Sequence, residues 1–399
     1  MGKFRTLDDL GDLTGKVALV RVDLNMPMSD GAVTDLTRAE ASRPTVLELA
    51  AKGAKVLLLS HFGRPKGERN STMSVSMAQG ALEQVLGCEV MFIPEVAGPV
   101  AAQAIDILRP GDVGLLENTR FWPGEEANDM DFARAIAANA DLFVNDAFSA
   151  AHRAHASTEA LAHLLPAYAG RSMEAELKAL DAALGNPQPP VAAVVGGAKV
   201  SSKLAVLEHL VGKVQHLIIG GGMANTFLAA RGVDVGKSLC EHDLAAKAEA
   251  IMQAADAAGC TVHLPYDVVT SREFRANPPV RTVNVYEVAA EEMILDVGPA
   301  AVEALADVLK NCRTLVWNGP LGAFEIEPFD AATVSLARTA AALTREGSLV
   351  SVAGGGDTVA ALAHAGVTQD FTFVSTAGGA FLEWMEGKPL PGVDALNIV

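Results

Sequence analysis

Short, fully apolar segments alternate with longer segments of helical pattern along most of this chain, and this alternation constrains the fold more than any other feature. The apolar segments are rich in Val, Ile and Leu, which is typical of strands buried on both faces of a parallel sheet. Strands that alternate with helices in this way predict repeated βαβ units. The expected strands are residues 17–22, 55–60, 90–93, 113–117, 142–145, 191–195, 216–220, 261–264, 314–317, 348–352 and 371–375.

The chain has 399 residues, which is too long for one typical core, and a proline-rich break divides its βαβ pattern. The break is LGNPQPP at residues 184–190, where the prolines cannot continue the preceding helical pattern. We therefore predict an α/β fold of two parallel-sheet domains, residues 1–185 and 186–380. The first would include a connecting helix at about 172–185, and an irregular tail would follow at 381–399.

The charge and the cysteines limit the partners and the compartment. The formal net charge of −17 argues against binding to nucleic acid or to an anionic membrane surface. Both halves of the chain are acidic, so an anion site would need a local concentration of Arg and Lys. The first ten residues, MGKFRTLDDL, contain no apolar signal region, and the four cysteines are scattered without a C-x-x-C motif. We therefore expect a reduced, cytoplasmic protein.

Basic side chains follow the expected strands of the first half. In an open parallel sheet, ligands bind beyond the carboxyl ends of the strands, which meet at one edge. One arginine there is most simply a solvated surface residue. Several strands that each deliver a basic residue favour a small ligand with several negative charges, because guanidinium groups match phosphate and carboxylate oxygens. The candidates are these basic residues and two polar neighbours, and we call the whole set the basic cluster. They are Arg21, Asp23, Asn25, Arg38, His61, Arg64, Arg120 and Arg153.

Glycines follow the expected strands of the second half. One glycine pair is most simply a tight turn between strand and helix, but the pattern recurs at five strands, with lysines and an aspartate beside it. It favours a nucleotide site in which backbone N–H groups at helix starts face phosphates. Asp357 could offer a hard oxygen ligand to Mg²⁺. The candidates are Gly196, Gly197, Lys199, Lys203, Gly220, Gly221, Gly222, Gly319, Gly322, Gly354, Gly355, Gly356, Asp357, Gly378 and Gly379.

Two local matches carry no function. The segment GVDVGKSL (232–239) imitates a Walker phosphate loop, but its required first glycine would be residue 231, which is Arg. The histidines of HRAH have no evident metal-binding partner, so we interpret His152 as site lining and His155 as structural.

Segments spread from residue 21 to residue 380 resemble those of the phosphoglycerate kinase family, in the family's order and at its spacing. They are RVDLNMP (21–27), SHFGRP (60–65), ENTRF (117–121), AHRAHAS (151–157), GGAKVSSKL (196–204), GGGMANTFL (220–228), WNGPLGAFE (317–325), AGGGDT (353–358) and VSTAGGA (374–380). The resemblance implies reversible phosphoryl transfer between 1,3-bisphosphoglycerate and MgADP. It also implies a hinge-bending monomer of two Rossmann-like, three-layer αβα domains separated by a cleft, with the tail packing back on the first domain.

The resemblance also implies individual roles. The basic cluster would bind 3-phosphoglycerate, Glu325 would bind the ribose, and Asp357 would bind Mg²⁺. Implied catalytic residues are Arg38, Lys203, Gly378 and Gly379. The implied nucleotide-binding residues are Gly196, Gly197, Lys199, Lys203, Gly221, Gly222, Asn318, Pro320, Gly322, Glu325, Gly354, Gly355, Gly356, Asp357 and Thr358. An ionised carboxylate would be the nucleophile in the ATP-consuming direction, so the reaction needs positioning and charge neutralisation rather than a general base.

The chain departs from the usual family pattern at four positions. Ser149 and Ala150 replace glycine and threonine, Ala175 replaces lysine, and Ala377 replaces glycine. None of these changes removes a candidate ligand, and we expect them to affect loop geometry.

Two other interpretations stay open at this point. A nicotinamide-dependent dehydrogenase would explain the fold but not the basic cluster, and no G-x-G-x-x-G motif occurs. A catalytically inactive anion-binding relative would explain the basic cluster, but the retention of Arg38, Lys203 and Asp357 argues against it.

Overall fold

The computed structural model describes residues 3–29 and 31–398. Within it the chain forms two compact units. Unit 1 comprises the residues up to Leu177 together with those from Pro389 onward, and unit 2 comprises Lys178–Lys388. The division falls within helix α7 (Arg171–Leu180), which continues as a π-helical turn at Asp181–Gly185 before the proline-rich segment.

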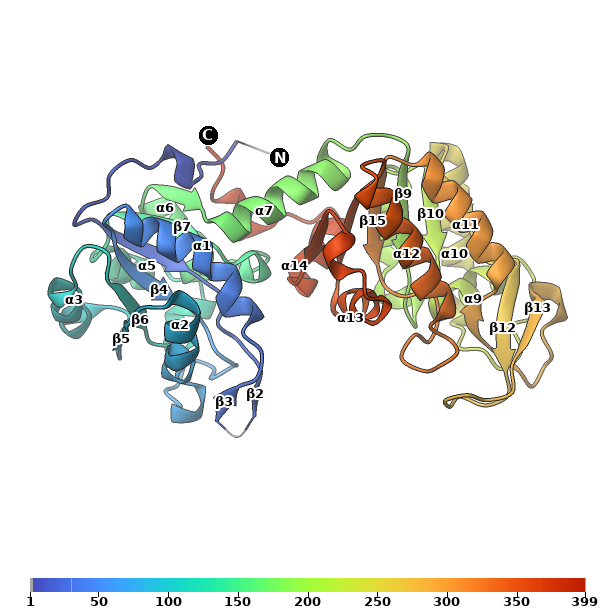
Figure 1. The fold of residues 1–399 in the computed structure, drawn as a ribbon, viewed down its shortest axis with the longest axis horizontal. Coiled ribbons are helices and arrows are strands. Elements are labelled where there is room, and N and C mark those ends of the chain that lie inside the picture. The colour runs from blue at the N-terminus through green and yellow to red at the C-terminus, as the bar shows by residue number, and fades with distance from the viewer. Residues whose placement is uncertain (1–2, 30, 399) are drawn as a thin grey trace. The chain divides into compact units, whose positions relative to one another are not determined.

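Unit 1 is built on a parallel sheet that contains every strand expected in the first half of the chain. The strand order is β5-β6-β4-β1-β7-β8 (Figure 1). The bounds are β1 (Val17–Arg21), β4 (Lys55–Leu59), β5 (Val90–Ile93), β6 (Val113–Leu116), β7 (Leu142–Asn145) and β8 (Ala167–Ala169). The edge strand β8 is an addition to the expected set. A short hairpin of β2 (Met28–Ser29) and β3 (Ala32–Val33) follows β1.

Both faces of this sheet are buried, which explains why its strands are continuously apolar. Val20 packs in one core with residues of α1 and α2, whereas its neighbour Leu19 packs in a second core with residues of α3, α5 and α6. The helices of unit 1 are α1 (Thr37–Ala51), α2 (Gln79–Leu86), α3 (Gly98–Ile107), α4 (Pro123–Glu126), α5 (Met130–Ala137), α6 (Leu161–Leu164), α15 (Pro391–Asp394) and the first part of α7. The arrangement is a three-layer αβα sandwich, as predicted.

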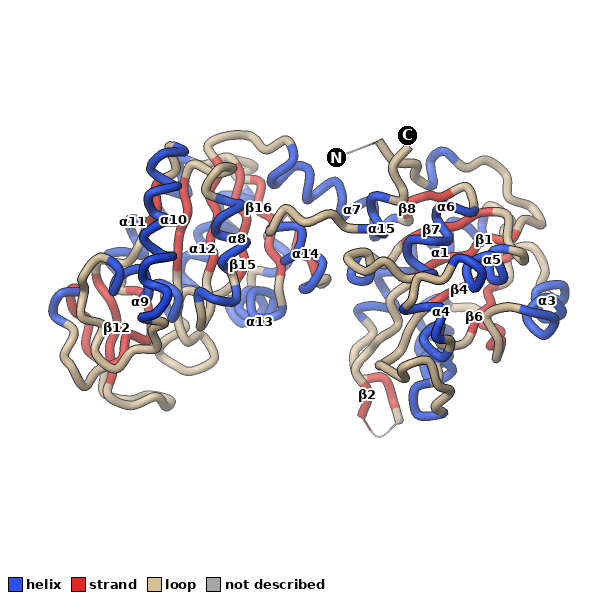
Figure 2. The backbone as a smooth tube through the Cα atoms, turned by 180° about the vertical axis from the view of Figure 1, so that it is seen from behind, coloured by secondary structure: helices blue, strands red, loops and turns tan. Residues whose placement is uncertain are grey.

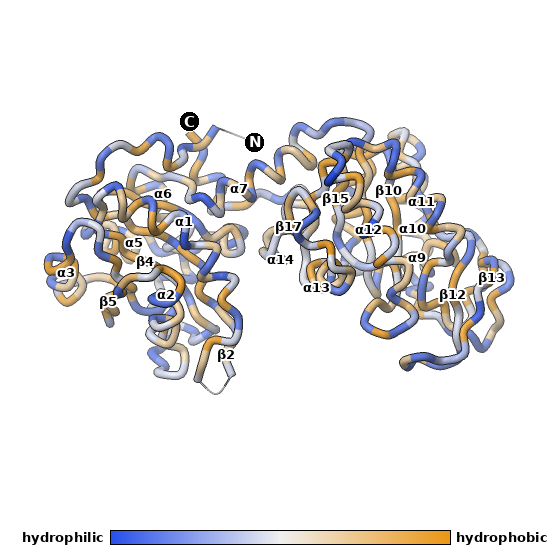
Figure 3. Tube along the Cα trace, viewed as in Figure 1, coloured by the Kyte–Doolittle hydropathy of each residue, from blue (hydrophilic) through white to orange (hydrophobic). Residues whose placement is uncertain are grey.

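Unit 2 repeats this architecture with strand order β11-β10-β9-β15-β16-β17, again parallel throughout. Figure 3 shows hydrophobic colour along β10, in the interior of this sheet. The bounds are β9 (Val191–Val195), β10 (His216–Ile219), β11 (Thr261–His263), β15 (Thr314–Asn318), β16 (Val350–Gly354) and β17 (Phe373–Ser375). All of these strands lie where the sequence predicts them.

Helices cover both faces of the unit 2 sheet. Figure 1 shows α11 and α12 in front of it, and Figure 2 shows α8 and α10 in front of the opposite face. Trp317 on β15 is buried in the core that contains Leu305 of α11, Leu336 of α12 and Leu362 of α13. The helices are α8 (Leu204–Leu210), α9 (Gly221–Ala230), α10 (Ala245–Ala258), α11 (Pro299–Asn311), α12 (Ala331–Arg345), α13 (Gly356–Ala365) and α14 (Gly378–Met385).

A small antiparallel sheet in unit 2 was not among the expected strands. It has the order β13-β12-β14. The bounds are β12 (Asp267–Ser271), β13 (Arg281–Asn284) and β14 (Met293–Val297). These strands mix buried with half-exposed residues, because only part of each packs on its own small core. They therefore lack the continuous apolar pattern of a fully buried strand. No helix within the described residues is long and apolar enough to cross a membrane.

Candidate functional site

The basic cluster gathers at one edge of the unit 1 sheet. Strands β6, β4, β1 and β7 are parallel neighbours, so the segments that follow them leave the sheet at the same edge. Arg21 ends β1, and its Nη2 lies 2.8 Å from Nδ1 of His61, which follows β4. Arg120, which follows β6, donates from Nη1 to the carbonyl oxygen of Gly63 at 2.9 Å. The side chain of Asn25 holds the same loop by accepting from the Gly63 N–H at 2.9 Å.

Burial lowers the pKa values of the arginine and histidine side chains at this edge of the sheet. The side chains of Arg21 and Arg120 are buried, and burial lowers the pKa of both guanidinium groups. Burial, followed by the positive charges of Arg21 and Arg120, holds the pKa of His61 well below its usual 6.5. The same causes lower the pKa of His155 to about 4. Both imidazoles are therefore neutral at pH 7, while the two guanidinium groups remain charged.

A buried carboxylate compensates part of this positive charge. Glu125, at the end of the short helix α4, is fully buried and accepts from Ser157 twice, from the hydroxyl at 2.6 Å and from the N–H at 3.0 Å. Ser157 Oγ in turn accepts from Nε of Arg21 at 2.9 Å. The chain Glu125–Ser157–Arg21 thus fixes a guanidinium group that lies at the end of the central strand. Sequence reasoning did not identify Glu125 or Ser157.

Arg38 lies apart from this buried group, in the first turn of α1. Its Nη1 donates to both carboxylate oxygens of Asp23, at 2.9 and 3.0 Å, and to the carbonyl oxygen of Asn25 at 2.9 Å. Ser149 also donates to Asp23, at 2.5 Å. Ser149 stands where the family usually has glycine, so this hydroxyl adds a contact to the carboxylate that holds Arg38.

The remaining basic candidates are more accessible. Arg64 is exposed, and Arg153 is half-buried with its Nε 3.2 Å from Nε2 of His152. The other departures from the family pattern are small side chains: Ala150 and Ala377 are buried, and Ala175 is exposed on α7.

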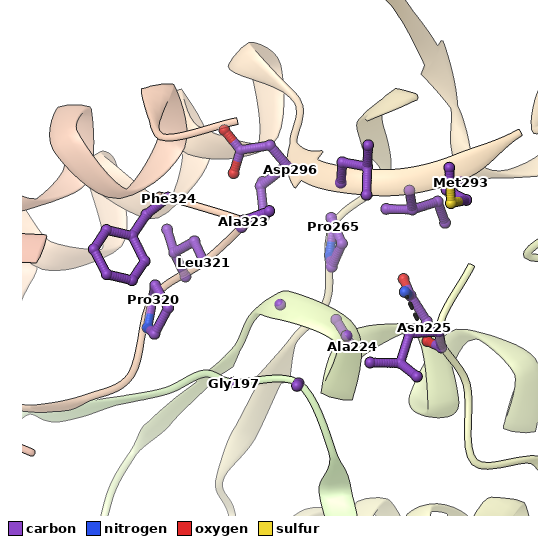
Figure 4. Close-up of a pocket in the computed structure, with 18 of the residues that line it drawn as sticks. Gly197, Ala224, Asn225, Pro265, Met293, Asp296, Pro320, Leu321, Ala323 and Phe324 are labelled. Atoms are coloured by element: carbon purple, nitrogen blue, oxygen red, sulfur yellow. Dashed lines mark hydrogen bonds between the residues drawn. The ribbon is translucent and has the colours of Figure 1, made fainter. Parts of the chain in front are cut away.

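Unit 2 contains a pocket of about 380 Å³ beside the carboxyl ends of its strands (Figure 4). Seven sequence candidates line it: Gly197, Gly221, Gly222, Pro320, Gly322, Glu325 and Asp357. Its other walls are mainly apolar, and several come from or near the unexpected antiparallel sheet. They include Pro265, Phe274, Met293, Ile294, Leu295 and Val297. Sequence reasoning missed these residues because their apolar side chains read as ordinary core. We call this cavity the unit 2 pocket.

The glycines beside this pocket serve two different purposes. A Cβ atom at Gly196 would lie 1.9 Å from the carbonyl oxygen of Pro320, and one at Gly319 would lie 2.1 Å from the carbonyl oxygen of Gly196. These glycines are required because two loops pack directly against each other. A Cβ atom at Gly356 would meet nothing within 4 Å, so the start of α13 is open. Only the second kind leaves room for a ligand at the backbone.

Polar groups hold the loops around this open helix start. Lys203 donates to the carbonyl oxygen of Asn318 at 3.1 Å and to its side-chain Oδ1. Burial lowers the pKa of Lys203 to about 8, against the opposing effect of the Asp357 carboxylate. Thr358 Oγ1 accepts from the N–H of Gly319 at 2.7 Å, and Asn318 Nδ2 donates to the carbonyl oxygen of Gly354 at 2.7 Å.

The two other groups of candidates lie beside these loops. Gly378 and Gly379 begin helix α14, and a Cβ atom at Gly378 would lie 3.8 Å from the Gly356 nitrogen. Lys199 is exposed at the end of the loop after β9. Asp296, at the pocket's margin, was not a candidate. Its Oδ2 accepts from the N–H of Ala332 at 2.9 Å, and burial raises its pKa well above the usual value.

The side chains beside the unit 2 pocket could bind Mg²⁺ only together with oxygen ligands from a nucleotide. The described residues contain no group of three or more His, Cys, Asp or Glu side chains that could hold a metal ion. Asp357 is a single exposed carboxylate at the open start of α13 and lines the pocket. Mg²⁺ in nucleotide sites commonly uses one or two carboxylates together with water and phosphate oxygens, so Asp357 fits a metal that arrives with a nucleotide.

Relatives of this chain are found over its whole length. The family model of phosphoglycerate kinase matches residues 7–388. The phosphoglycerate kinase of Sphingopyxis alaskensis is 76% identical over 397 residues, covering 100% of both chains, and that of Zymomonas mobilis is 68% identical over 394 residues, covering 99% of both. The solved phosphoglycerate kinase of Coxiella burnetii has a TM-score of 0.93 at 40% identity, covering 99% of both chains. That of Pyrococcus horikoshii has a TM-score of 0.81 at 31% identity, covering 99% of this chain and 98% of that one.

Proposed function

This chain belongs to the phosphoglycerate kinase family, and we propose that its two units divide the substrates of the family's reaction between them. The reaction is the reversible transfer of a phosphoryl group between 1,3-bisphosphoglycerate and MgADP, giving 3-phosphoglycerate and MgATP in glycolysis and gluconeogenesis. The observation that carries the division is the contrast between two sheet edges. Guanidinium groups gather beyond the carboxyl ends of the unit 1 strands. An apolar pocket with an open helix start lies beside the carboxyl ends of the unit 2 strands.

In this proposal unit 1 binds the phosphoglycerate. Its ligand carries a phosphate and a carboxylate, which guanidinium groups bind through paired hydrogen bonds. Arg64 and Arg153 are accessible enough to contact it directly, whereas the buried Arg21 and Arg120 supply positive potential and order the loops. Neutral His61 would donate or accept a hydrogen bond without adding to the charge repulsion.

Unit 2 binds the nucleotide in the same proposal. The apolar walls of the unit 2 pocket suit a purine base, Glu325 suits the ribose hydroxyl groups, and the open start of α13 suits a phosphate. Lys199 and Lys203, at the two ends of the short turn after β9, would supply positive charge to the phosphates. Mg²⁺, when bound through Asp357 and the phosphates, would neutralise phosphate charge.

The catalytic roles follow from the chemistry of the acceptor. The carboxylate of 3-phosphoglycerate is ionised at neutral pH, so no residue has to remove a proton from it. The residues must instead neutralise charge on the phosphoryl group as it moves. We assign this role to Arg38, to Lys203 and to the N–H groups of Gly378 and Gly379 at the start of α14. Family membership sets aside the dehydrogenase interpretation.

The compartment and the oligomeric state are also part of the proposal. We propose a cytoplasmic monomer that binds neither nucleic acid nor membranes. The strongly acidic net charge of −17 argues against binding to nucleic acid or to an anionic membrane surface. All four cysteines lie in the described part of the chain and are free thiols, as expected in a reducing compartment.

A phosphotransfer assay tests the function directly. With 3-phosphoglycerate and MgATP, the purified protein should produce ADP at a rate that requires both substrates and falls when Mg²⁺ is chelated. ADP formation without 3-phosphoglycerate, or no turnover with both substrates present, would contradict an active kinase and favour the inactive relative.

A further inference from the structure

The hydroxyl group of Ser149 joins two loops at the edge of the unit 1 sheet where the basic cluster lies. Ser149 is half-buried in a single 3₁₀ turn, Phe148–Ala150, which follows β7. Its Oγ donates to Oδ2 of Asp23, in the segment that follows β1, at 2.5 Å. A bond this short is typical of a hydroxyl group that donates to an ionised carboxylate. The Asp23 carboxylate is therefore fixed to the loop after β7 as well as to its own segment.

The orientation of the Asp23 carboxylate depends on one donor at each oxygen. Oδ1 accepts from the N–H of Asn25 at 3.0 Å, and Oδ2 accepts from Ser149. Arg38 reaches both oxygens from a single nitrogen, Nη1, so it does not by itself prevent the carboxylate from rotating. Within the described part of the chain, removing the Ser149 hydroxyl would leave Oδ2 with Arg38 as its only donor.

Arg38 is held by one side of its guanidinium group. Nη1 donates to Asp23 and to the carbonyl oxygen of Asn25, whereas no described residue accepts from Nε or Nη2. The side chain is 38% exposed, so this second side is accessible. Nε and Nη2 together form the edge through which a guanidinium group binds carboxylate or phosphate with two parallel hydrogen bonds. The position of the Asp23 carboxylate therefore sets the direction in which this edge faces.

We propose that Ser149 is a positioning residue for Arg38: by fixing the Asp23 carboxylate, its hydroxyl group directs the free edge of the Arg38 guanidinium toward the reacting group of the substrate. The inference rests on the proposed catalytic role of Arg38 and adds a residue that acts through it. The hydroxyl also occupies a lone pair of Asp23 Oδ2, so the carboxylate competes less strongly with a substrate anion for Arg38. An interaction made mainly in the transition state affects kcat rather than KM, and Ser149 should share this signature.

Steady-state kinetics of the full chain with 3-phosphoglycerate and MgATP test this inference. Ser149→Ala should lower kcat roughly 3- to 10-fold and change KM for 3-phosphoglycerate by less than about twofold. Ser76→Ala is the matched control, because Ser76 is also a half-buried serine of unit 1 but its hydroxyl bonds with that of Ser74, at 2.8 Å. The control should leave both values unchanged. An unchanged kcat in Ser149→Ala, or a change confined to KM, would overturn the inference.

A double variant shows whether Ser149 acts through Arg38. Adding Ser149→Ala to Arg38→Ala should change kcat by less than about twofold, because the group being positioned is already absent. If Ser149→Ala lowers kcat by the same factor in both backgrounds, Ser149 acts independently of Arg38, and the inference is wrong while the catalytic role of Arg38 stands. A near-normal kcat in Arg38→Ala alone would instead contradict the catalytic role of Arg38, and the inference with it.

Discussion

Replacing the buried carboxylate of Glu125 should destabilise unit 1 while strengthening its affinity for an anion. Glu125→Gln keeps the size and shape of the side chain but removes its negative charge. It also turns one of the two oxygens that accept from Ser157 into a donor. The nearby guanidinium groups of Arg21 and Arg120, whose pKa values the Glu125 charge raises, lose that compensation.

The size of the effect follows from burial. Glu125 is 0% exposed, and removing one member of a buried charge network typically costs about 3–5 kcal/mol of unfolding free energy. For a domain of this size, 1 kcal/mol shifts Tm by roughly 2–4 °C, so the expected loss is roughly 6–20 °C. The neighbouring Glu126 provides a matched control, because its side chain is 42% exposed and lies 3.5 Å from Nε of Arg120. Glu126→Gln should cost less than about 1 kcal/mol.

Thermal unfolding of both variants, with and without 3-phosphoglycerate, is the assay. The loss of a negative charge behind the anion site raises its positive potential, so 3-phosphoglycerate should raise the Tm of Glu125→Gln by more than it raises the Tm of the wild-type chain. Equal losses in Glu125→Gln and Glu126→Gln would refute the argument from burial. A smaller ligand-induced shift in Glu125→Gln would refute the argument from charge.

Three further predictions concern catalysis, metal use and pH. Arg38→Ala should lower kcat by roughly 10²–10³ with a modest change in KM for 3-phosphoglycerate, because it removes charge stabilisation of the transition state. Arg64→Ala should mainly raise that KM, and steady-state kinetics at saturating MgATP separates the two cases. Asp357→Asn should weaken the Mg²⁺ dependence of the rate and leave the affinity for 3-phosphoglycerate intact, and an unchanged Mg²⁺ titration would leave Asp357 as a helix-start residue only. Burial raises the pKa of Asp146 to about 7, so the native state binds a proton on this carboxyl group more tightly than the unfolded chain does. The protonated Asp146 therefore stabilises the fold at low pH, and this contribution is lost as pH rises from about 4 to 7. Asp146→Asn should flatten that part of the stability profile in denaturant titrations, and an unchanged slope would contradict the assignment.

The fold was predictable wherever strands are buried on both faces. Such strands are continuously apolar, so both parallel sheets could be located from the sequence pattern alone. The antiparallel sheet of β12, β13 and β14 was missed because its strands mix polar and apolar residues and pack on a small core. That omission mattered for the site, since β14 forms part of the wall of the unit 2 pocket.

The site was predictable as a set of positions but not as a network. Arg21 and His61 could be named because each closely follows an expected strand. Their environment depends on contacts between distant segments, such as the bond from Ser157 to Glu125, which carries no sequence signal. The glycines show the same limit, because Gly196 and Gly356 look alike in sequence, although one is required by loop packing and the other leaves a helix start open.

Hydrogen exchange on the full chain, measured by mass spectrometry with each substrate alone, tests the central claim most directly. The division of substrates predicts that 3-phosphoglycerate slows exchange mainly around residues 21–25, 61–64 and 149–153 of unit 1. MgADP should slow exchange mainly around residues 196–204, 220–225 and 354–358 of unit 2. Protection of the unit 2 glycine loops by 3-phosphoglycerate alone, with the unit 1 segments unchanged, would contradict the assignment of one substrate to each unit.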